Sequence, residues 1–161
     1  IGGISGATQI MRKIGVPDDI EIGASEDDMH REPYLSYLNR TTPLAMAQLF
    51  DRFDTEMRNT LLLYSEIANM VEQCRTGIDR LVAPLSSSNT TIGHKTGTGF
   101  PTSDGRISAI NDCGYVNLPN GERYSIAVFV ADSGYDMAET SAIIAEISRI
   151  VWIRLTEQKK D

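Results

Sequence analysis

The sequence has only two cysteines, Cys74 and Cys113, and contains no C-x-x-C pair. Two cysteines are too few for a framework of disulfides, and neither has the cysteine or histidine neighbours that signal a zinc site. We therefore expect two buried free thiols rather than a disulfide, although the sequence alone leaves their state open. The residues also indicate no metal and no bound cofactor.

Positive charge is also scarce. Lysine and arginine number 15 against 22 aspartates and glutamates, so the formal net charge is -7. No basic stripe is available to neutralise phosphates, which argues against a nucleic-acid partner. No apolar run approaches the roughly 20 residues that a membrane-spanning helix needs. With 41 % hydrophobic residues the chain can still form a packed core.

The first half of the sequence has the periodicity of helices. Apolar residues recur at helical spacing from the N-terminus to Gly15. Thr42 and Pro43 predict a helix start, with threonine as the cap and proline at the first helical position. A further helix is expected around Met70, and a short one over residues 76–85.

The second half has the shorter period of strands. Strands are expected at residues 90–96, 107–118 and 123–131, and Asn120-Gly121 between the last two is a strong hairpin signal. A long amphipathic helix follows them. The fold class is therefore α/β of the α+β type, with helices followed by a three-stranded antiparallel meander and a C-terminal helix.

The expected strand at 90–96 runs into an unusual segment, "HKTGTG", at residues 94–99. Glycine weakens a strand and often marks a place where another group approaches the backbone closely. A lysine followed by threonine hydroxyls and exposed N–H groups makes a suitable surface for an anion. An ordinary exposed strand lysine explains the three residues K-T-G equally well when they are taken alone.

A long polar stretch, "DDIEIGASEDDMHREPYLSYLNRTTP" at residues 18–43, has no clean period. Loops of this length are uncommon inside compact domains and are often functional. Its acidic cluster at residues 26–28 lacks the spacing and the glycine of a calcium-binding EF-hand loop. A solvated acidic face is the simpler interpretation of these carboxylates.

The order of loop, capped helix, K-T-G strand, hairpin and terminal helix resembles the serine β-lactamase and penicillin-binding-protein superfamily, where K-T-G lines the active site. "SEDDMHREPYLSYLNRTTP" is similar to the omega loop of class A β-lactamases, in a divergent subgroup with histidine in that loop. The resemblance extends from Ile1 to about Leu155. It implies that residues 1–85 belong to the all-helical subdomain with the omega loop, and residues 86–161 to the sheet subdomain with the C-terminal helix.

The resemblance also implies roles for individual loop residues. Glu26 takes the position of the general base that activates the deacylating water. His30 stands four positions later, where asparagine is usual, and would hold Glu26 or its water by a hydrogen bond. Asn39 would anchor the far end of the loop. The alternatives are a solvated carboxylate at Glu26 and an ordinary loop histidine at His30.

On the strand, the resemblance assigns Lys95 the positive field for the carboxylate of a β-lactam. The backbone N–H of Thr98 would be one of two oxyanion-hole donors. Thr96, Gly97, Thr98 and Gly99 would together contact the substrate. Small residues at Gly97 and Gly99 are expected to keep the edge of the strand open for it.

The resemblance implies β-lactam hydrolysis through an acyl-enzyme in a periplasmic or secreted parent enzyme. The family also needs the motifs S-x-x-K and S-D-N, and the sequence contains neither. We expect a C-terminal part that is inactive alone, exposes apolar surface and binds either the missing N-terminal half or a second copy. A D,D-peptidase-like domain and a catalytically dead domain that binds β-lactams or peptidoglycan peptides are the alternatives.

Overall fold

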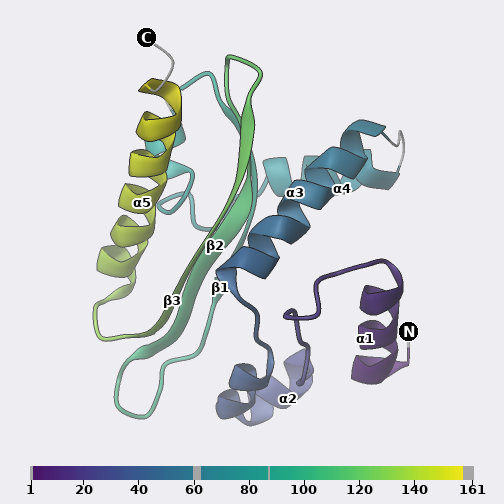
Figure 1. Ribbon diagram of the computed structural model, residues 1–161. Helices are drawn as coiled ribbons and strands as arrows, with labels where there is room; N and C mark the ends of the chain where they lie inside the picture. Colours follow the sequence, from purple (N-terminus) through teal and green to yellow (C-terminus); the bar gives the residue numbers. More distant parts are fainter. Residues whose placement is uncertain (1, 60–62, 87, 158–161) are drawn as a thin grey trace.

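The fold is described by a computed structural model covering residues 2–59, 63–86 and 88–157 (Figure 1). The element order confirms the expected sequence of helices, three strands and a final helix: α1 (Gly3–Lys13), α2 (Glu26–Arg31), the 3-10 turn η1 (Pro33–Leu38), α3 (Pro43–Asn59), α4 (Leu63–Glu72), η2 (Ala83–Leu85), β1 (Thr91–Thr98), β2 (Ile107–Asn117), β3 (Arg123–Ser133) and α5 (Met137–Glu157). The expected outer boundaries at residues 1 and 161 lie outside the described residues, and the division at residue 85 remains a prediction.

The three strands form one antiparallel sheet in the order β1-β2-β3. The helices α3 and α4 pack on one face, and α5 with η2 packs on the other, while α1 and α2 lie beyond one end of α3 (Figure 1). Within the described residues β1 has a strand neighbour on one side only. The strand that carries K-T-G is therefore an edge strand.

Local signals in the sequence explain where several elements begin. Ser25 and Asp28 form a reciprocal capping box at the start of α2. The Thr42 hydroxyl accepts a hydrogen bond from the backbone N–H of Ala45 at 3.1 Å, which caps α3. Gly121 has φ +84° in the turn between β2 and β3, a conformation that favours glycine.

The main core lies between the sheet and α5. Its members are apolar residues from the segment around η2, from β2 and β3, and from α5: Leu81, Leu85, Ile110, Val116, Leu118, Ile126, Val128 and Ile144. Large apolar side chains also remain at the surface, as expected, and Met70 on α4 is 73 % exposed. No helix in the described part of the chain combines the length and the apolar character that crossing a bilayer requires.

The prediction of a short helix over residues 76–85 is wrong. The segment forms successive turns, and only residues 83–85 make a 3-10 helix. The N–H of Leu81 donates to the Asp112 carboxylate at 3.2 Å, and the N–H of Arg80 bonds the carbonyl of Gly77 at 2.9 Å. An α-helix needs both N–H groups for carbonyls four residues earlier, so these contacts exclude it.

Both cysteines are free, as expected, but only one is buried. Cys113 lies inside the sheet on β2, whereas Cys74 is partly exposed. The expected burial of Cys74 is wrong because α4 ends at Glu72, so the cysteine follows the helix instead of sitting on its packed face.

Candidate functional site

A cleft of about 690 Å³ lies between the K-T-G strand, the rest of the sheet and the end of the polar loop, at residues 36–41. Among the residues with expected roles, it is lined by Asn39, Lys95, Thr96, Gly97 and Gly99. Its remaining wall includes a polar part from η1 and the segment before α3, formed by Ser36, Tyr37, Arg40 and Thr41. The rest of the wall is largely apolar and comes from β2, β3, α3 and Val71 of α4. The structure therefore brings five of the eight expected site residues to one cleft, although the first and the last of them, Asn39 and Gly99, are 60 positions apart in the sequence.

The other three expected residues, Glu26, His30 and Thr98, do not line this cleft. The hydroxyl of Thr98 points to the opposite face of the sheet, where it accepts a hydrogen bond from Arg80 at 2.8 Å. The backbone N–H of Gly99 donates to Ala109 on β2 at 2.8 Å. Because N–H directions alternate along a strand, the N–H of Thr98 points to the free edge of β1.

Lys95 and Thr96 keep their polar groups at this free edge. The Lys95 Nζ atom is exposed and donates to the carbonyl of Thr96 at 2.6 Å. The Thr96 hydroxyl lies 2.6 Å from the hydroxyl of Thr76, which belongs to the segment after α4. A positive charge, a hydroxyl pair and a strand N–H therefore occupy one short length of edge, which is a set of groups that binds a carboxylate.

Glycine occurs at positions 97 and 99 for two different physical reasons. A Cβ atom at Gly97 would meet Asn111 only at an ordinary 3.8 Å, so glycine here leaves space in the cleft. A Cβ atom at Gly99 would lie 2.2 Å from the Ser108 hydroxyl and 2.9 Å from a backbone nitrogen of β2. Glycine at position 99 is thus required by close strand packing, which the sequence did not indicate.

Arg80 is a site residue that the sequence analysis missed. It is buried, and its guanidinium donates to the carbonyls of Gly97 and Asn111 at 3.3 and 2.9 Å, besides the Thr98 hydroxyl. Its Nε atom lies 3.4 Å from the Ser141 hydroxyl on α5. Arg80 therefore fixes the strand at Gly97 and Thr98. The available signal was a single arginine directly before the apolar run that begins at Leu81.

Asn39 joins the two ends of the loop that contains α2 and η1. Its Oδ1 atom accepts from the N–H groups of Gly23 and Ala24 at 2.8 and 2.9 Å, and its Nδ2 atom donates to the carbonyl of Ala24 at 3.1 Å and to the sulfur of Met29 at 3.3 Å. One amide side chain thus satisfies three backbone groups that have no place in a helix or strand. It also lines the cleft, so the loop and the cleft share this anchor.

Glu26 and His30 lie on the exposed face of α2. The Glu26 side chain is 75 % exposed, and its carboxylate is 3.7 Å from His30 Nδ1, too far for a hydrogen bond. His30 Nδ1 instead lies 2.9 Å from the Glu26 carbonyl, and its ring packs edge-on against Phe100 at 5.5 Å between centroids. The partial burial expected for a general base is absent in the described chain. His30 links α2 to the end of the K-T-G strand.

A buried ion pair stands directly behind the site. His94 precedes Lys95 on β1 and is 1 % exposed, and its Nδ1 atom is 2.9 Å from Asp112 Oδ1 on β2. Burial alone lowers the pKa of His94, but the hydrogen bond and charge of Asp112, with a smaller contribution from Cys74, raise it above the ordinary value. Asp112 also holds the N–H of Leu81, so the pair connects the K-T-G strand to the segment that carries Arg80.

This pair predicts how stability depends on pH. A histidine whose pKa is raised by folding stabilises the fold fully below its unfolded pKa of about 6.5, and this contribution is lost as pH rises through the higher folded pKa. We expect the difference in free energy of unfolding between the wild type and His94→Gln to shrink as pH rises above neutrality. Urea unfolding at a series of pH values measures it. A difference that grows with pH would contradict the raised pKa.

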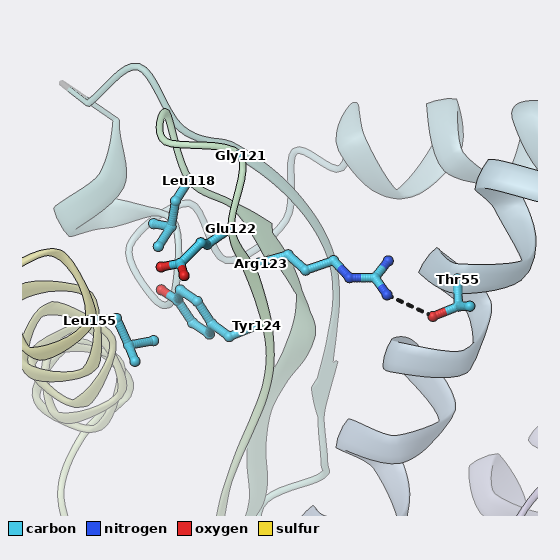
Figure 2. Close-up of a pocket in the computed structure, with 7 residues that line it drawn as sticks. All are labelled: Thr55, Leu118, Gly121, Glu122, Arg123, Tyr124 and Leu155. Carbon is cyan, nitrogen blue, oxygen red and sulfur yellow. Dashed lines mark hydrogen bonds between the residues drawn. The ribbon is translucent and has the colours of Figure 1, made fainter. Parts of the chain in front are cut away.

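A second cavity, of about 610 Å³, lies at the turn between β2 and β3 (Figure 2). Arg123 points from this turn toward α3, where it donates to Asp54 at 2.6 Å and to the Thr55 hydroxyl at 2.9 Å, while Tyr124 points toward Leu155 on α5 (Figure 2). None of the expected site residues lines this cavity. No group of histidine, cysteine, aspartate and glutamate in the described ranges is arranged to hold a metal ion.

Comparisons with known proteins give relatives over most of the chain. Residues 2–155 match the model of the beta-lactamase enzyme family. A beta-lactamase of Phocaeicola vulgatus is 36 % identical over 138 residues, which are 85 % of this chain and 43 % of the relative. The chain thus spans about half the length of the relatives it matches.

Solved structures agree with the sequence relatives. The TLA-3 extended-spectrum beta-lactamase has a TM-score of 0.86 and 36 % identity, with 96 % of this chain and 55 % of that chain covered. A class A beta-lactamase from Bacteroides cellulosilyticus has a TM-score of 0.85 and 34 % identity, with 97 % and 55 % covered. The chain therefore belongs to the beta-lactamase enzyme family, with the class A serine enzymes as its structural relatives.

Proposed function

We propose that this chain supplies the carboxylate-binding and deacylating residues of a class A serine β-lactamase, which hydrolyses β-lactams through an acyl-enzyme. The observation that carries the proposal is the shared cleft, where Lys95, Thr96 and Gly97 face the loop anchor Asn39. The free edge of β1 offers the charge and hydrogen-bond donors that this substrate class needs.

Each of these groups would act at a particular step of the reaction. The Lys95 ammonium and the Thr96 hydroxyl bind the substrate carboxylate, and the N–H of Thr98 donates to the oxyanion that forms when the strained amide is attacked. Removing one such donor typically slows an enzyme by about 10²–10³-fold. Arg80 holds the strand from behind so that this N–H keeps its direction. Glu26 takes the proton of the water that releases the acyl group, and His30 positions its loop.

The nucleophile comes from another segment in this proposal. The printed sequence contains neither S-x-x-K nor S-D-N, so the serine that forms the acyl-enzyme and its lysine partner lie outside it. Exposed apolar residues such as Met70 and the apolar wall of the cleft give that segment a surface to pack on. The periplasm or the exterior of the cell, where β-lactams act, is the proposed location.

The proposal is tested by hydrolysis of a chromogenic cephalosporin. The purified chain alone should show no turnover, because it has no serine with a lysine three positions later. Mixing it with the N-terminal half of a solved relative, carrying S-x-x-K and S-D-N, should restore hydrolysis. The control is the same half with its nucleophilic serine replaced by alanine, which should stay inactive.

Each other outcome has a clear meaning. Turnover by the chain alone, in a sample free of other polypeptides, would contradict the assignment of the nucleophile. Association of the two halves without acylation would favour a binding domain without catalysis. Acylation without release of the product would favour a D,D-peptidase-like domain, because Glu26 would then fail as the deacylating base.

A further inference from the structure

A single long-range hydrogen bond joins the polar loop at residues 18–41 to the sheet. The Tyr37 hydroxyl on η1 donates to Asp132 Oδ1 near the end of β3 at 2.6 Å, across 95 positions of sequence. Within the described residues no other hydrogen bond connects this loop with a strand. The backbones of α2 and η1 lie close to each other but not to any of the three strands. Side chains therefore make the connection between the loop and the sheet.

The acceptor of this bond has an unusual backbone conformation. Asp132 has φ +50°, and no other residue of the described chain except glycine has a positive φ. Such a conformation persists only where the surrounding structure holds it, often at functional positions. The next residue, Ser133, is buried, and its hydroxyl lies 2.7 Å from the Thr140 hydroxyl on α5 and accepts from the N–H of Tyr135 at 3.2 Å. The turn that presents the Asp132 carboxylate is thus fixed to the core.

The donor is equally well defined. The hydrogen bond to Asp132 raises the pKa of Tyr37, with further contributions from desolvation and from the charges of Asp132 and Asp104, so the phenol keeps its proton. A hydroxyl that donates to a carboxylate makes one of the stronger hydrogen bonds in proteins. Tyr34 lies three positions earlier on η1, but its hydroxyl bonds Glu32 of the same loop. Two neighbouring tyrosines therefore differ in whether they reach the sheet.

The bond also lies next to the candidate site. Tyr37 lines both the cleft of about 690 Å³ and a neighbouring cavity of about 420 Å³. The loop is braced internally by the Asn39 amide and by the bridge between Glu21 and Arg40. Because α2 packs on η1 within this braced loop, a contact at Tyr37 determines where Glu26 lies relative to the sheet.

We propose that Tyr37 is a positioning residue, whose hydrogen bond to Asp132 holds the loop against the sheet and thereby places Glu26 for the release of the acyl group. The role in deacylation rests on the proposed function. Tyr37 transfers no proton and forms no bond to the substrate. Breaking the bond should release the loop without moving Lys95 and Thr96, which belong to β1.

Hydrogen exchange of the full chain tests the bond itself, without any activity. Tyr37→Phe keeps the ring and removes the hydroxyl, so amides in peptides covering residues 18–41 should exchange about twofold to tenfold faster, the range that one hydrogen bond contributes. Peptides from β2 should be unchanged. Tyr34→Phe is the matched control and should exchange as the wild type does, because its hydroxyl bonds within the loop.

Two substitutions of the acceptor complete this experiment. Asp132→Gly removes the carboxylate but suits the positive φ, so it should reproduce the faster exchange of Tyr37→Phe without backbone strain. Asp132→Asn keeps an acceptor oxygen and tolerates the same conformation, so it should retain most of the protection. An effect of Asp132→Asn as large as that of Asp132→Gly would contradict a hydrogen bond at this position.

The positioning role is measured in the chain reassembled with the N-terminal half of a solved relative. After excess β-lactam is removed, mass spectrometry follows the loss of the acyl group. Tyr37→Phe should slow this release by about twofold to tenfold and leave the rate constant of acylation unchanged. Asp132→Asn and Tyr34→Phe should stay near the wild type. A mere loss of folded protein would lower the fraction acylated and not the rate constant of release.

The outcomes separate the two claims. Unchanged exchange in Tyr37→Phe, or an equal effect in Tyr34→Phe, would overturn the connection to the sheet. Faster exchange with normal release of the acyl group would overturn the positioning role. A wild type that forms no acyl-enzyme would contradict the proposed function, and with it the role in deacylation, whereas the exchange result would still decide whether Tyr37 holds the loop.

Discussion

Replacing Asp112 by alanine should lower the free energy of unfolding by about 3–5 kcal/mol, the usual cost of removing one partner of a buried ion pair. Asp112 is fully buried and has two partners, the His94 ring and the N–H of Leu81. The variant leaves a buried histidine and a buried N–H without their acceptor. Urea unfolding followed by circular dichroism measures the effect, at pH 6, where the raised pKa keeps His94 protonated.

The matched control is Asp104→Ala. Asp104 also forms an ion pair, with Arg106, but the Asp104 side chain is 61 % exposed. Surface substitutions of this kind usually stay within about 0.5 kcal/mol. If the free energy of unfolding falls by the same amount in both variants, the buried His94–Asp112 pair stabilises the fold no more than an exposed ion pair does. Asp112→Asn keeps an acceptor oxygen, so we expect it to fall between the wild type and the alanine variant.

Glu26→Gln should trap the acyl-enzyme in the reassembled protein. A positioned general base typically contributes about 10²–10⁴-fold to a rate, so deacylation should fall by a factor in this range while acylation persists. Mass spectrometry of the intact protein shows the trapped adduct, and a burst of product shows the surviving first step. This result requires that the segment carrying the nucleophile covers the Glu26 carboxylate, which is exposed in this chain.

Asp27→Asn is the control for this experiment. Asp27 is the next carboxylate along α2 and is also exposed, so it tests whether the negative charge of the loop alone is sufficient. An equal loss of deacylation in both variants would assign the effect to the charge of the loop and not to a base. Normal turnover in Glu26→Gln would remove Glu26 from the mechanism.

The meander could be predicted from sequence because its signals are local. Asn120-Gly121 sets the hairpin, and the strands on either side alternate within a few residues of it. The helix expected over residues 76–85 failed because the N–H of Leu81 bonds a carboxylate 31 positions later in the chain. No periodicity within the segment contains that partner. The partial exposure of Cys74 was missed for a related reason, since it depends on where α4 ends.

The site was predictable only in part. The K-T-G strand and Asn39 were found through the resemblance of their segments to class A β-lactamases, and the structure brings them to one cleft. The role of Arg80 was missed because it bonds the backbone carbonyls of Gly97 and Asn111. Every residue has a backbone carbonyl, so the sequence does not indicate which ones an arginine will bind. The exposure of Glu26 also could not be read from the sequence, because it depends on what packs over α2.

The position of β1 at the border of the sheet has a consequence for the behaviour of the chain at high concentration. A border strand presents unpaired N–H and carbonyl groups, which invite the same strand of another molecule to pair and begin aggregation. Lys95 projects a charge from the middle of this border, and proteins commonly use lysine there to keep neighbouring molecules apart. Two molecules aligned in antiparallel fashion through β1 would bring two such ammonium groups together. The residue proposed to attract a carboxylate therefore also limits self-association, and its loss should lower solubility.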